Sequence, residues 1–208
     1  MNPESGAPAG PLRRGNSSRK GWDDLKRTIA FVLLSALAVL PAVALAKSEP
    51  MVGGQAMYPS KDIVDNAVNS ADHTTLVAAV KAAGLVDTLK GQGPFTVFAP
   101  TNAAFSALPA GTVDSLLKPE NKAGLTKVLT YHVVPGKLDA AALQKAIKAG
   151  NGTATLKTAS GGMLWAMMNG DRNIVLKDEK GAVASISTYD VYQSNGVIHV
   201  IDRVVLPN

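Results

Sequence analysis

An eleven-residue segment near the middle of the chain constrains the fold most, because it joins a buried strand abruptly to a helix. Residues 95–99 mix aromatic, β-branched and small side chains, a composition that suits a strand buried on both faces. Pro100 lacks a backbone donor and disfavours a helical residue before it, so we expect the strand ladder to stop there. Thr101 is then placed to cap a helix through the amide of Ala104, and Phe105 begins the apolar face of that helix.

The first 46 residues have the pattern of an export signal. An uncharged apolar run at residues 29–40 follows basic residues, and Pro41 separates it from an Ala-x-Ala sequence that ends at Ala46. This order predicts a signal peptide at residues 1–46 that is cleaved near Ala46. The apolar run is short for a membrane span, and an uncleaved anchor over residues 28–46 is the alternative.

Cleavage leaves a flexible linker at residues 47–59 and one domain at residues 60–208, which is long enough to bury a core. The signal predicts a secreted or periplasmic protein, with membrane contact only through an uncleaved signal segment. The net charge of +5 resides largely in the leader, where six basic residues outweigh three acidic ones. The charge therefore argues against a nucleic-acid partner.

Helical patterns fill the first half of the predicted domain and strand patterns the second. Ser60 is placed to cap a first helix, Thr74 begins a second that Gly84 ends, and Asp139 caps a later helix at residues 140–149. Before that helix, residues 129–136 read as a strand closed by a Pro-Gly turn. Short β-rich runs follow at residues 153–158, 163–168, 173–177, 183–192 and 197–206. This order predicts an α+β domain with helices on one side of an antiparallel or mixed sheet.

The last run is apolar on both faces, because Val197, His199 and Ile201 alternate with equally apolar neighbours. Such a strand belongs in the interior, and we expect it beside residues 96–99. The preceding Asn195-Gly196 predicts a turn with positive φ. Asp202 follows the apolar run, where we expect it to accept hydrogen bonds and to have no chemical role.

Three segments in this order resemble the motifs of the fasciclin domain family: residues 96–105, Tyr131-His132 and residues 195–202. The resemblance covers about residues 60–208 in one copy. It implies a fasciclin-like β-wedge of two sheets with a layer of α-helices. The positions that match these motifs and that we expect to serve the fold are Thr96, Phe98, Pro100, Thr101, Asn102, Phe105, Asn195, Gly196, His199 and Asp202.

In matrix-associated members of this family, the positions that match Asp190-Val191 and Tyr131-His132 are implicated in integrin-mediated cell adhesion. The resemblance therefore implies that Asp190, Val191, Tyr131 and His132 bind a partner. Val191 replaces the isoleucine of those members, and the chain has no Arg-Gly-Asp tripeptide, which argues against an integrin as such. From the residues alone, Asp190 is equally well explained as a solvated turn carboxylate and Tyr131 as a core aromatic with a hydrogen-bonded hydroxyl.

The sequence offers little catalytic or metal-binding chemistry. It has no cysteine and only three histidines, His73, His132 and His199, none of them paired at helical spacing, so we expect neither a metal nor a cofactor. His132 and His199 lie in apolar runs and are expected to be buried neutral imidazoles, each hydrogen-bonded to a neighbour. Residues 169–173 begin like a calcium loop but lack its glycine and glutamate, so a hairpin turn is expected. Residues 163–168 are expected to form a core-facing strand in which methionine fills gaps, and an exposed binding stripe is the alternative.

Two main hypotheses follow. The first is a non-enzymatic adhesion or recognition module that binds an extracellular or envelope protein or glycan. The second is an envelope carrier of small molecules, or an enzyme, that uses a pocket near His132 or Trp165. Self-association is a third hypothesis.

Overall fold

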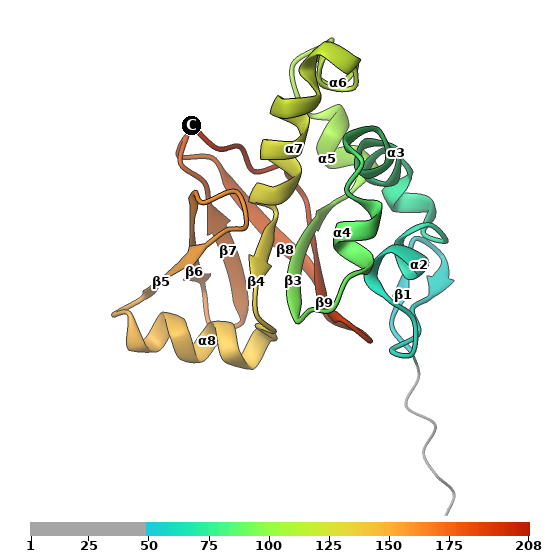
Figure 1. The fold of residues 1–208 in the computed structure, drawn as a ribbon. Helices are drawn as coiled ribbons and strands as arrows, with labels where there is room; N and C mark the ends of the chain where they lie inside the picture. Colours follow the sequence, from blue (N-terminus) through green and yellow to red (C-terminus); the bar gives the residue numbers. More distant parts are fainter. Residues whose placement is uncertain (1–48) are drawn as a thin grey trace, which may run out of the picture. The chain divides into compact units, whose positions relative to one another are not determined.

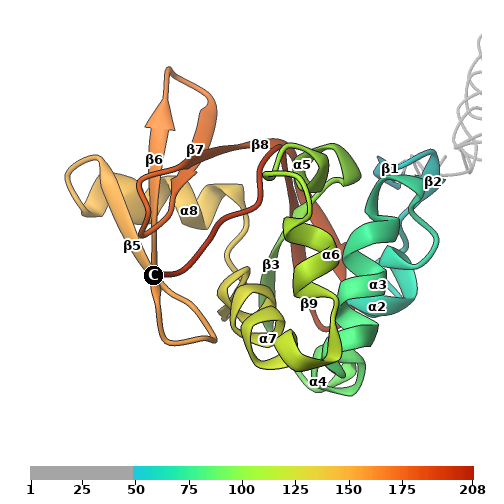
Figure 2. The same cartoon turned by 90° about the horizontal axis from the view of Figure 1, so that it is seen from above.

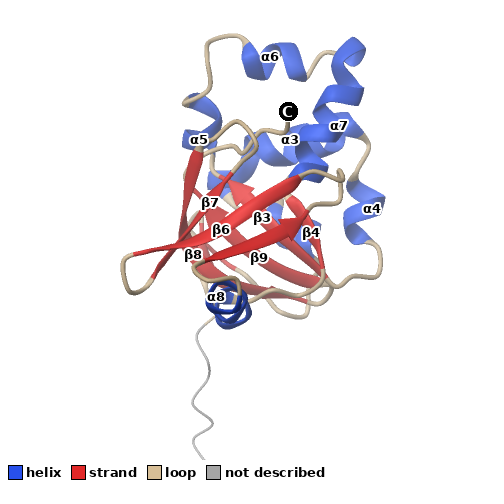
Figure 3. Cartoon of the chain, turned by 90° about the vertical axis from the view of Figure 1, so that its left-hand side faces the viewer, coloured by secondary structure: helices blue, strands red, loops and turns tan. Residues whose placement is uncertain are grey.

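The computed structural model describes residues 49–208 (Figure 1), so the predicted signal peptide, its cleavage near Ala46 and the alternative anchor lie outside the described residues. The described part is a folded sheet with helices packed on it, as Figure 3 shows in red and blue. No helix among residues 49–208 has the length and apolar character needed to cross a membrane.

The main sheet has seven strands in the order β4-β3-β9-β8-β7-β6-β5, and a separate hairpin pairs β1 with β2. The strands are β1 (Met51–Val52), β2 (Gln55–Ala56), β3 (Phe95–Pro100), β4 (Val133–Pro135), β5 (Thr153–Lys157), β6 (Met163–Asn169), β7 (Asn173–Lys177), β8 (Val183–Gln193) and β9 (Gly196–Ile201). Strand β8 belongs to both halves of this sheet, because its first residues pair with β7 and its later ones with β9. Irregular register between Ile186 and Val191 lets the strand bend from one half into the other. The expected α+β wedge of two sheets is confirmed.

Strands β3 and β9 lie side by side at the centre, and they run parallel with Phe98 opposite His199. All six residues of β9 are buried, which confirms the interior position expected from its two apolar faces. The expectation that the ladder stops at Pro100 is confirmed, because β3 ends there with Pro100 opposite Ile201. Just beyond it, the amide of Thr101 donates to the Ile201 carbonyl at 3.3 Å.

Most helices gather on the β3–β9 half, while α8 lies against the other half (Figure 2). The helices are α2 (Ile63–Ala67), α3 (Thr74–Ala83), α4 (Val86–Lys90), α5 (Asn102–Ser106), α6 (Thr112–Leu116), α7 (Lys122–Tyr131) and α8 (Ala140–Ala149), with short 3₁₀ turns at Ala71–His73 and Pro119–Asn121. The order of helices and strands along the chain therefore places the helical layer on one half of the wedge.

Local signals placed most helix ends correctly. Thr101 accepts from the Ala104 amide at 3.2 Å, and Asp139 accepts from the Ala142 amide at 2.8 Å. Gly84 ends α3 with a φ of 73°. The expectation for Ser60 is wrong, because α2 begins at Ile63 and Asp62 is its cap. The Asp62 carboxylate directly precedes the first helical residue and accepts from the Asp65 amide, so it caps the helix in place of the Ser60 hydroxyl two residues earlier.

Three other boundaries also differ from expectation. Residues 51–57, expected within a flexible linker, form the β1–β2 hairpin and bury Val52 and Met57. The strand expected at 129–136 is confined to β4, because α7 continues through Tyr131. The last strand ends at Ile201, and the expected strand residues after it are irregular. In the first two cases the boundary goes with the tertiary burial of Val52, Met57 and Tyr131, which the local pattern does not report.

Two hydrophobic cores fill the domain. The helical core packs α3, α5 and α7 against one face of β3 and β9, around Leu76, Val97 and Ile198. The wedge core lies between the two halves of the sheet and α8, around Phe98, Leu143 and Leu176. Strand β3 contributes to both, since alternate side chains point to opposite faces.

Candidate functional site

The β8 irregularity holds Asp190 in a conformation that is rare for a residue with a side chain. Its φ is 57°, and Asn151 is the other non-glycine residue with positive φ among residues 49–208. The Asp190 carboxylate accepts from the Ala140 amide at 2.7 Å, and its own amide approaches His199 Nδ1 at 3.4 Å. Together with Asp139, Asp190 therefore places a second carboxylate at the amino end of α8, where the helix dipole favours negative charge.

Exposed and half-exposed groups surround Asp190. Tyr192 lies two residues along β8, and its hydroxyl is 3.5 Å from Asp139 Oδ2. The Lys137 ammonium lies over the Tyr192 ring, 4.7 Å from its centroid. Desolvation, with the nearby charges of Asp190 and Asp139, raises the pKa of the Tyr192 phenol. We call Lys137, Asp139, Asp190 and Tyr192 the Asp190 patch.

Val191, the neighbour of Asp190, points into the protein. Its side chain is 1% exposed and belongs to the helical core. The two adjacent side chains point to opposite sides of β8, leaving Asp190 near the surface and Val191 inside. As it lies, Val191 is not accessible to a partner, and its partner-binding role stays a prediction.

Tyr131 and His132 are at the end of α7, where it enters β4, and both are buried. The Tyr131 hydroxyl donates to the Met163 carbonyl at 2.6 Å and accepts from the Glu179 amide at 3.1 Å. Burial raises the pKa of this phenol to about 12. Tyr131 thus fastens α7 to the ends of the wedge strands, and its contact with a partner also stays a prediction.

His132 and His199 are neutral imidazoles with both ring nitrogens occupied, as expected. His132 Nδ1 is 2.8 Å from the Val128 carbonyl, so it carries the proton, and Nε2 accepts from the Val205 amide at 3.2 Å. His199 has the opposite tautomer, because Nε2 is 2.8 Å from the Leu138 carbonyl. Burial lowers both pKa values, that of His132 to about 4. Neither ring has a nitrogen left for proton transfer or metal binding.

The third histidine, His73, is buried in the helical layer, and its Nδ1 is 2.8 Å from the Ser70 hydroxyl. Burial lowers the pKa of this imidazole too. Within residues 49–208, no three His, Asp or Glu side chains come together in a way that could hold a metal ion.

The two predicted partner-binding pairs lie at opposite ends of β4. Tyr131 and His132 precede the strand, whereas Asp190 bonds to Ala140, beyond the loop that follows it. The structure therefore brings Asp190 together with Lys137, Asp139 and Tyr192, and it does not bring it together with Tyr131.

Several motif residues have structural contacts. Thr96 donates to the Gly136 carbonyl and accepts from the Leu138 amide, fixing the loop before α8. Asn102 accepts from the Thr75 amide at 3.0 Å and so caps α3 from a distant segment. Asp202 accepts from the Ser185 amide at 2.7 Å, as expected. Phe98 stacks on His199 with ring centroids 5.7 Å apart, and Phe105 is a buried residue of α5.

The Asn195-Gly196 turn does not have the expected positive φ. The Asn195 side chain instead joins the turn to the helical layer, because it accepts from the Ile63 amide and donates to the Leu89 carbonyl. Only glycine fits at position 196, because β9 lies so close to β3 that an added Cβ would be 2.1 Å from the Phe95 carbonyl oxygen. Gly196 thus serves the close packing of β9 on β3, and Asn195 joins the turn to the helices; the turn pattern in the sequence does not distinguish these roles.

A clasp that sequence reasoning missed holds the carboxyl-terminal segment. Asp178 is 1% exposed and accepts from the amides of Ala182 and Leu206. Glu179 accepts from the amides of Met163 and Asn208, and these hydrogen bonds lower the pKa of its carboxyl. The only sequence signal for this clasp is the pair of acids before Lys180-Gly181. An ordinary exposed hairpin has the same pattern, so the signal does not predict the clasp.

The β6 segment is also different from expectation. Leu164 and Ala166 face the core, while Met163, Trp165 and Met167 lie half-buried on the other face. Trp165 and Met167 line an open depression with Lys177 and Lys180. The neighbouring turn is the expected hairpin, in which Asn169 pairs with Asn173.

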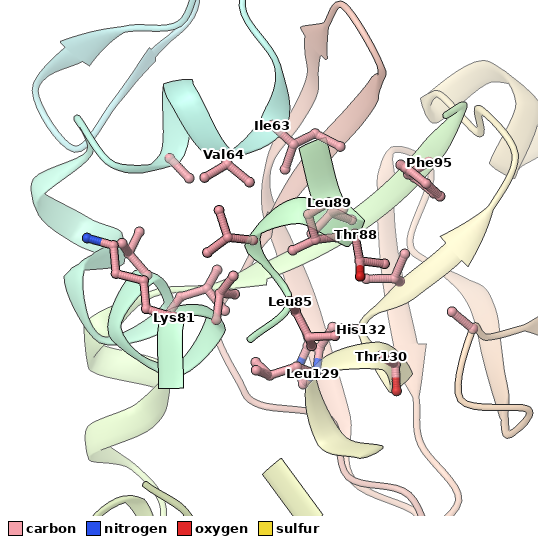
Figure 4. Close-up of a pocket in the computed structure, with 18 of the residues that line it drawn as sticks. Ile63, Val64, Lys81, Leu85, Thr88, Leu89, Phe95, Leu129, Thr130 and His132 are labelled. Carbon is pink, nitrogen blue, oxygen red and sulfur yellow. The ribbon is translucent and has the colours of Figure 1, made fainter. Parts of the chain in front are cut away.

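His132, but not Trp165, lines an apolar cavity of about 100 Å³ between the helices and β3. The second hypothesis placed one pocket near either residue; the structure separates them into two sites. The cavity presents mainly aliphatic side chains from α2, α3, α4, β3 and α7 (Figure 4).

Comparison with known proteins identifies the family. The fasciclin domain model matches residues 71–207. Protein sll1483 of Synechocystis is 46% identical over 189 residues, which cover 87% of this chain and 96% of that protein. The cell surface glycolipoprotein MPB83 of Mycobacterium bovis is 34% identical over 161 residues, covering 75% of this chain and 64% of that protein.

A solved structure has the same fold. It is a FAS1 domain pair from the insect cell adhesion molecule fasciclin I, with a TM-score of 0.52 at 20% identity. The match covers 68% of this chain and 45% of that one. The motifs, the wedge and these matches together show that the chain belongs to the fasciclin domain family.

Proposed function

We propose that the protein is an exported, non-enzymatic recognition module that adheres to a protein or glycan partner through the Asp190 patch. The leader pattern supports export, and so does the similarity to a relative named as a cell surface glycolipoprotein. The structural likeness to a domain pair from a cell adhesion molecule supports adhesion. The occupied ring nitrogens of His132 and His199 support a role without catalysis.

The observation that carries the proposal is the bulge at Asp190. A non-glycine residue with positive φ costs free energy, and such residues gather at functional sites. Bulges also redirect side chains at functional edges. Here the bulge leaves a carboxylate, a lysine and a tyrosine together near the surface. Tyrosine is enriched where proteins meet, since one side chain offers both apolar area and a hydrogen bond.

In this proposal the other predicted residues act from within. Val191 anchors the bulge in the helical core, and Tyr131 and His132 hold α7 against the wedge and the carboxyl-terminal segment. Substituting them affects adhesion through the position of the patch. Asp190, Lys137 and Tyr192 supply the contacts.

An adhesion assay with surface substitutions tests the proposal. Beads coated with the full-length protein are mixed with cells of the organism that makes it, and retained beads are counted. Lys137→Ala combined with Tyr192→Ala should reduce retention severalfold, because both side chains leave the patch while the core is untouched. Asp190→Asn should reduce it less, because asparagine tolerates positive φ and its amide oxygen can still accept from Ala140.

Lys157→Ala, an exposed position on β5, is the matched control and should retain beads like the wild type. Circular dichroism must show that every variant is folded. Equal retention by the double variant and the wild type would exclude the patch as the adhesive surface. Light scattering on the unbound protein separates a distinct partner from self-association.

A further inference from the structure

The apolar cavity beneath the helical layer is a second site, independent of the Asp190 patch. Ile63 and Val64 of α2, Leu85 before α4, and Leu89 of α4 point toward a common space above β3 (Figure 4). The volume of about 100 Å³ is a large void for an interior packed to native density. An engineered apolar cavity in another protein, of ~150 Å³, stays dry and takes up benzene. A void of this kind favours an apolar guest over water.

The polar residues of the lining are Lys81, Thr88, Thr130 and His132, and the last two use their polar groups outside the cavity. His132 uses both ring nitrogens on the backbone of Val128 and Val205. The Thr130 hydroxyl donates to the Thr126 carbonyl at 2.7 Å, within its own helix. Because the rest of the lining is almost entirely aliphatic, the interior favours a mainly apolar guest, such as an alkyl chain.

The rim of the cavity is positively charged. Lys81 is the only charged residue among the described residues that line it, and its ammonium lies at the edge of the cavity in Figure 4. An anionic group at this edge is thus complementary to the Lys81 ammonium.

The helix that covers the cavity is weakly held. Helix α4 has five residues, none of them buried, and no side-chain cap at its start. It is tied down at its carboxyl end, where Asn195 bonds to the Leu89 carbonyl and Lys90 pairs with Asp62. Short elements with few buried contacts open at low free-energy cost, so α4 is the natural entrance.

We propose that this cavity binds the alkyl chain of a fatty carboxylate, with the chain between α4 and β3 and the carboxylate at Lys81. The void of about 100 Å³ is smaller than a ten-carbon chain, so α4 must shift outward to admit it. The aliphatic interior takes the chain, and Lys81 at the rim selects the acid over its neutral or cationic counterpart. This proposal does not depend on the adhesive role of the Asp190 patch.

Titration of the full-length protein with decanoate, decanol and decyltrimethylammonium tests the proposal, with affinity measured by calorimetry. Decanoate should bind most tightly, and methyl NMR signals of Val80 and Leu129 should shift on its addition. Val77→Phe, which fills the cavity from a half-buried position, should weaken decanoate binding at least about tenfold. Lys81→Glu should weaken decanoate about tenfold and leave decanol unchanged.

Lys157→Glu is the matched charge control and should bind decanoate like the wild type. Val86→Phe is a second filling variant from the same lining, in case Val77→Phe does not fold. Absence of decanoate binding to the wild type would overturn the proposal, as would undiminished binding to a folded filling variant. Decanol binding as tightly as decanoate would overturn the assignment of the carboxylate to Lys81.

Discussion

The two cores of this domain share a strand and yet are packed differently. In the wedge core, Leu164, Ile174, Leu176 and Ala184 are all 0% exposed. In the helical core, Leu76 is 8% exposed and Val80 9%, and a cavity lies among them. The wedge is built from long paired strands, whereas the helical layer includes helices of only five residues.

The difference indicates a division of labour. Strands fixed by ladders on both sides leave little freedom, so side chains between them pack to native density. Short helices are held mainly by tertiary contacts and can shift by small amounts. The pairing of β8 with β9 supports the Asp190 patch, and adaptability in the helical layer suits a site that must admit a ligand.

Truncating one leucine in each core gives the largest contrast. Leu176→Ala in the wedge core should lower the free energy of unfolding by about 4 kcal/mol, because rigid strands cannot close the new void. Leu76→Ala beside the existing cavity should cost about 2 kcal/mol, because that side chain has fewer contacts to lose. Urea unfolding with linear extrapolation measures both, and equal losses would contradict the difference in packing.

Acid should weaken the junction between the cores. Burial lowers the pKa of His132 from 6.5 to about 4. Between these pH values the unfolded chain binds a proton at His132 and the folded chain does not, so the free energy of unfolding falls as pH falls. The contribution of neutral His132 to the free energy of unfolding is fully present above about pH 6.5. Near pH 4 the free energy of unfolding is lower by about 3 kcal/mol.

The lowered pKa values of His73 and His199 act in the same direction. Urea unfolding at a series of pH values measures the slope, and His132→Gln should flatten it. A pKa near 6.5 for His132 in the folded protein, measured by NMR, would exclude the mechanism.

Removing the Tyr131 hydroxyl tests the hydrogen bonds that join α7 to the wedge strands. Tyr131→Phe should lower the free energy of unfolding by about 2 kcal/mol, because the Met163 carbonyl and the Glu179 amide both lose their partner in the interior. Tyr58→Phe, whose side chain is exposed, is the control and should be neutral. Thermal unfolding is sufficient to separate the two.

Enlarging one side chain in each core should give small effects of opposite sign. Val77→Phe fills existing space and should raise the free energy of unfolding by about 1 kcal/mol. Ala166→Val, at a 0% exposed position in the wedge, should lower it by about 1 kcal/mol, because the core has no room. The same sign for both would show that the cores do not differ in free space.

Prediction from sequence worked best where a few adjacent residues determine the outcome. The caps at Thr101 and Asp139, the end of α3 at Gly84 and the hairpin at residues 169–173 are local arrangements of backbone and side chain. Prediction from sequence failed where contacts between distant segments determine the local structure. The pattern around Tyr131 reads as a strand, yet packing against the wedge extends α7 through that residue. The clasp of Asp178 and Glu179 depends on a carboxyl-terminal segment that no local pattern connects to it.

The sequence by itself determined the class of fold, the family and the central pairing, because two segments apolar on both faces have no stable place except beside each other in the interior. Only the tertiary structure decided which predicted site residues reach the surface, since neighbouring residues of β8 point to opposite sides and only the packing shows that Val191 is on the core side. It also decided where the free space lies. Packing depends on how side chains from six separate segments meet, and no one segment carries that information.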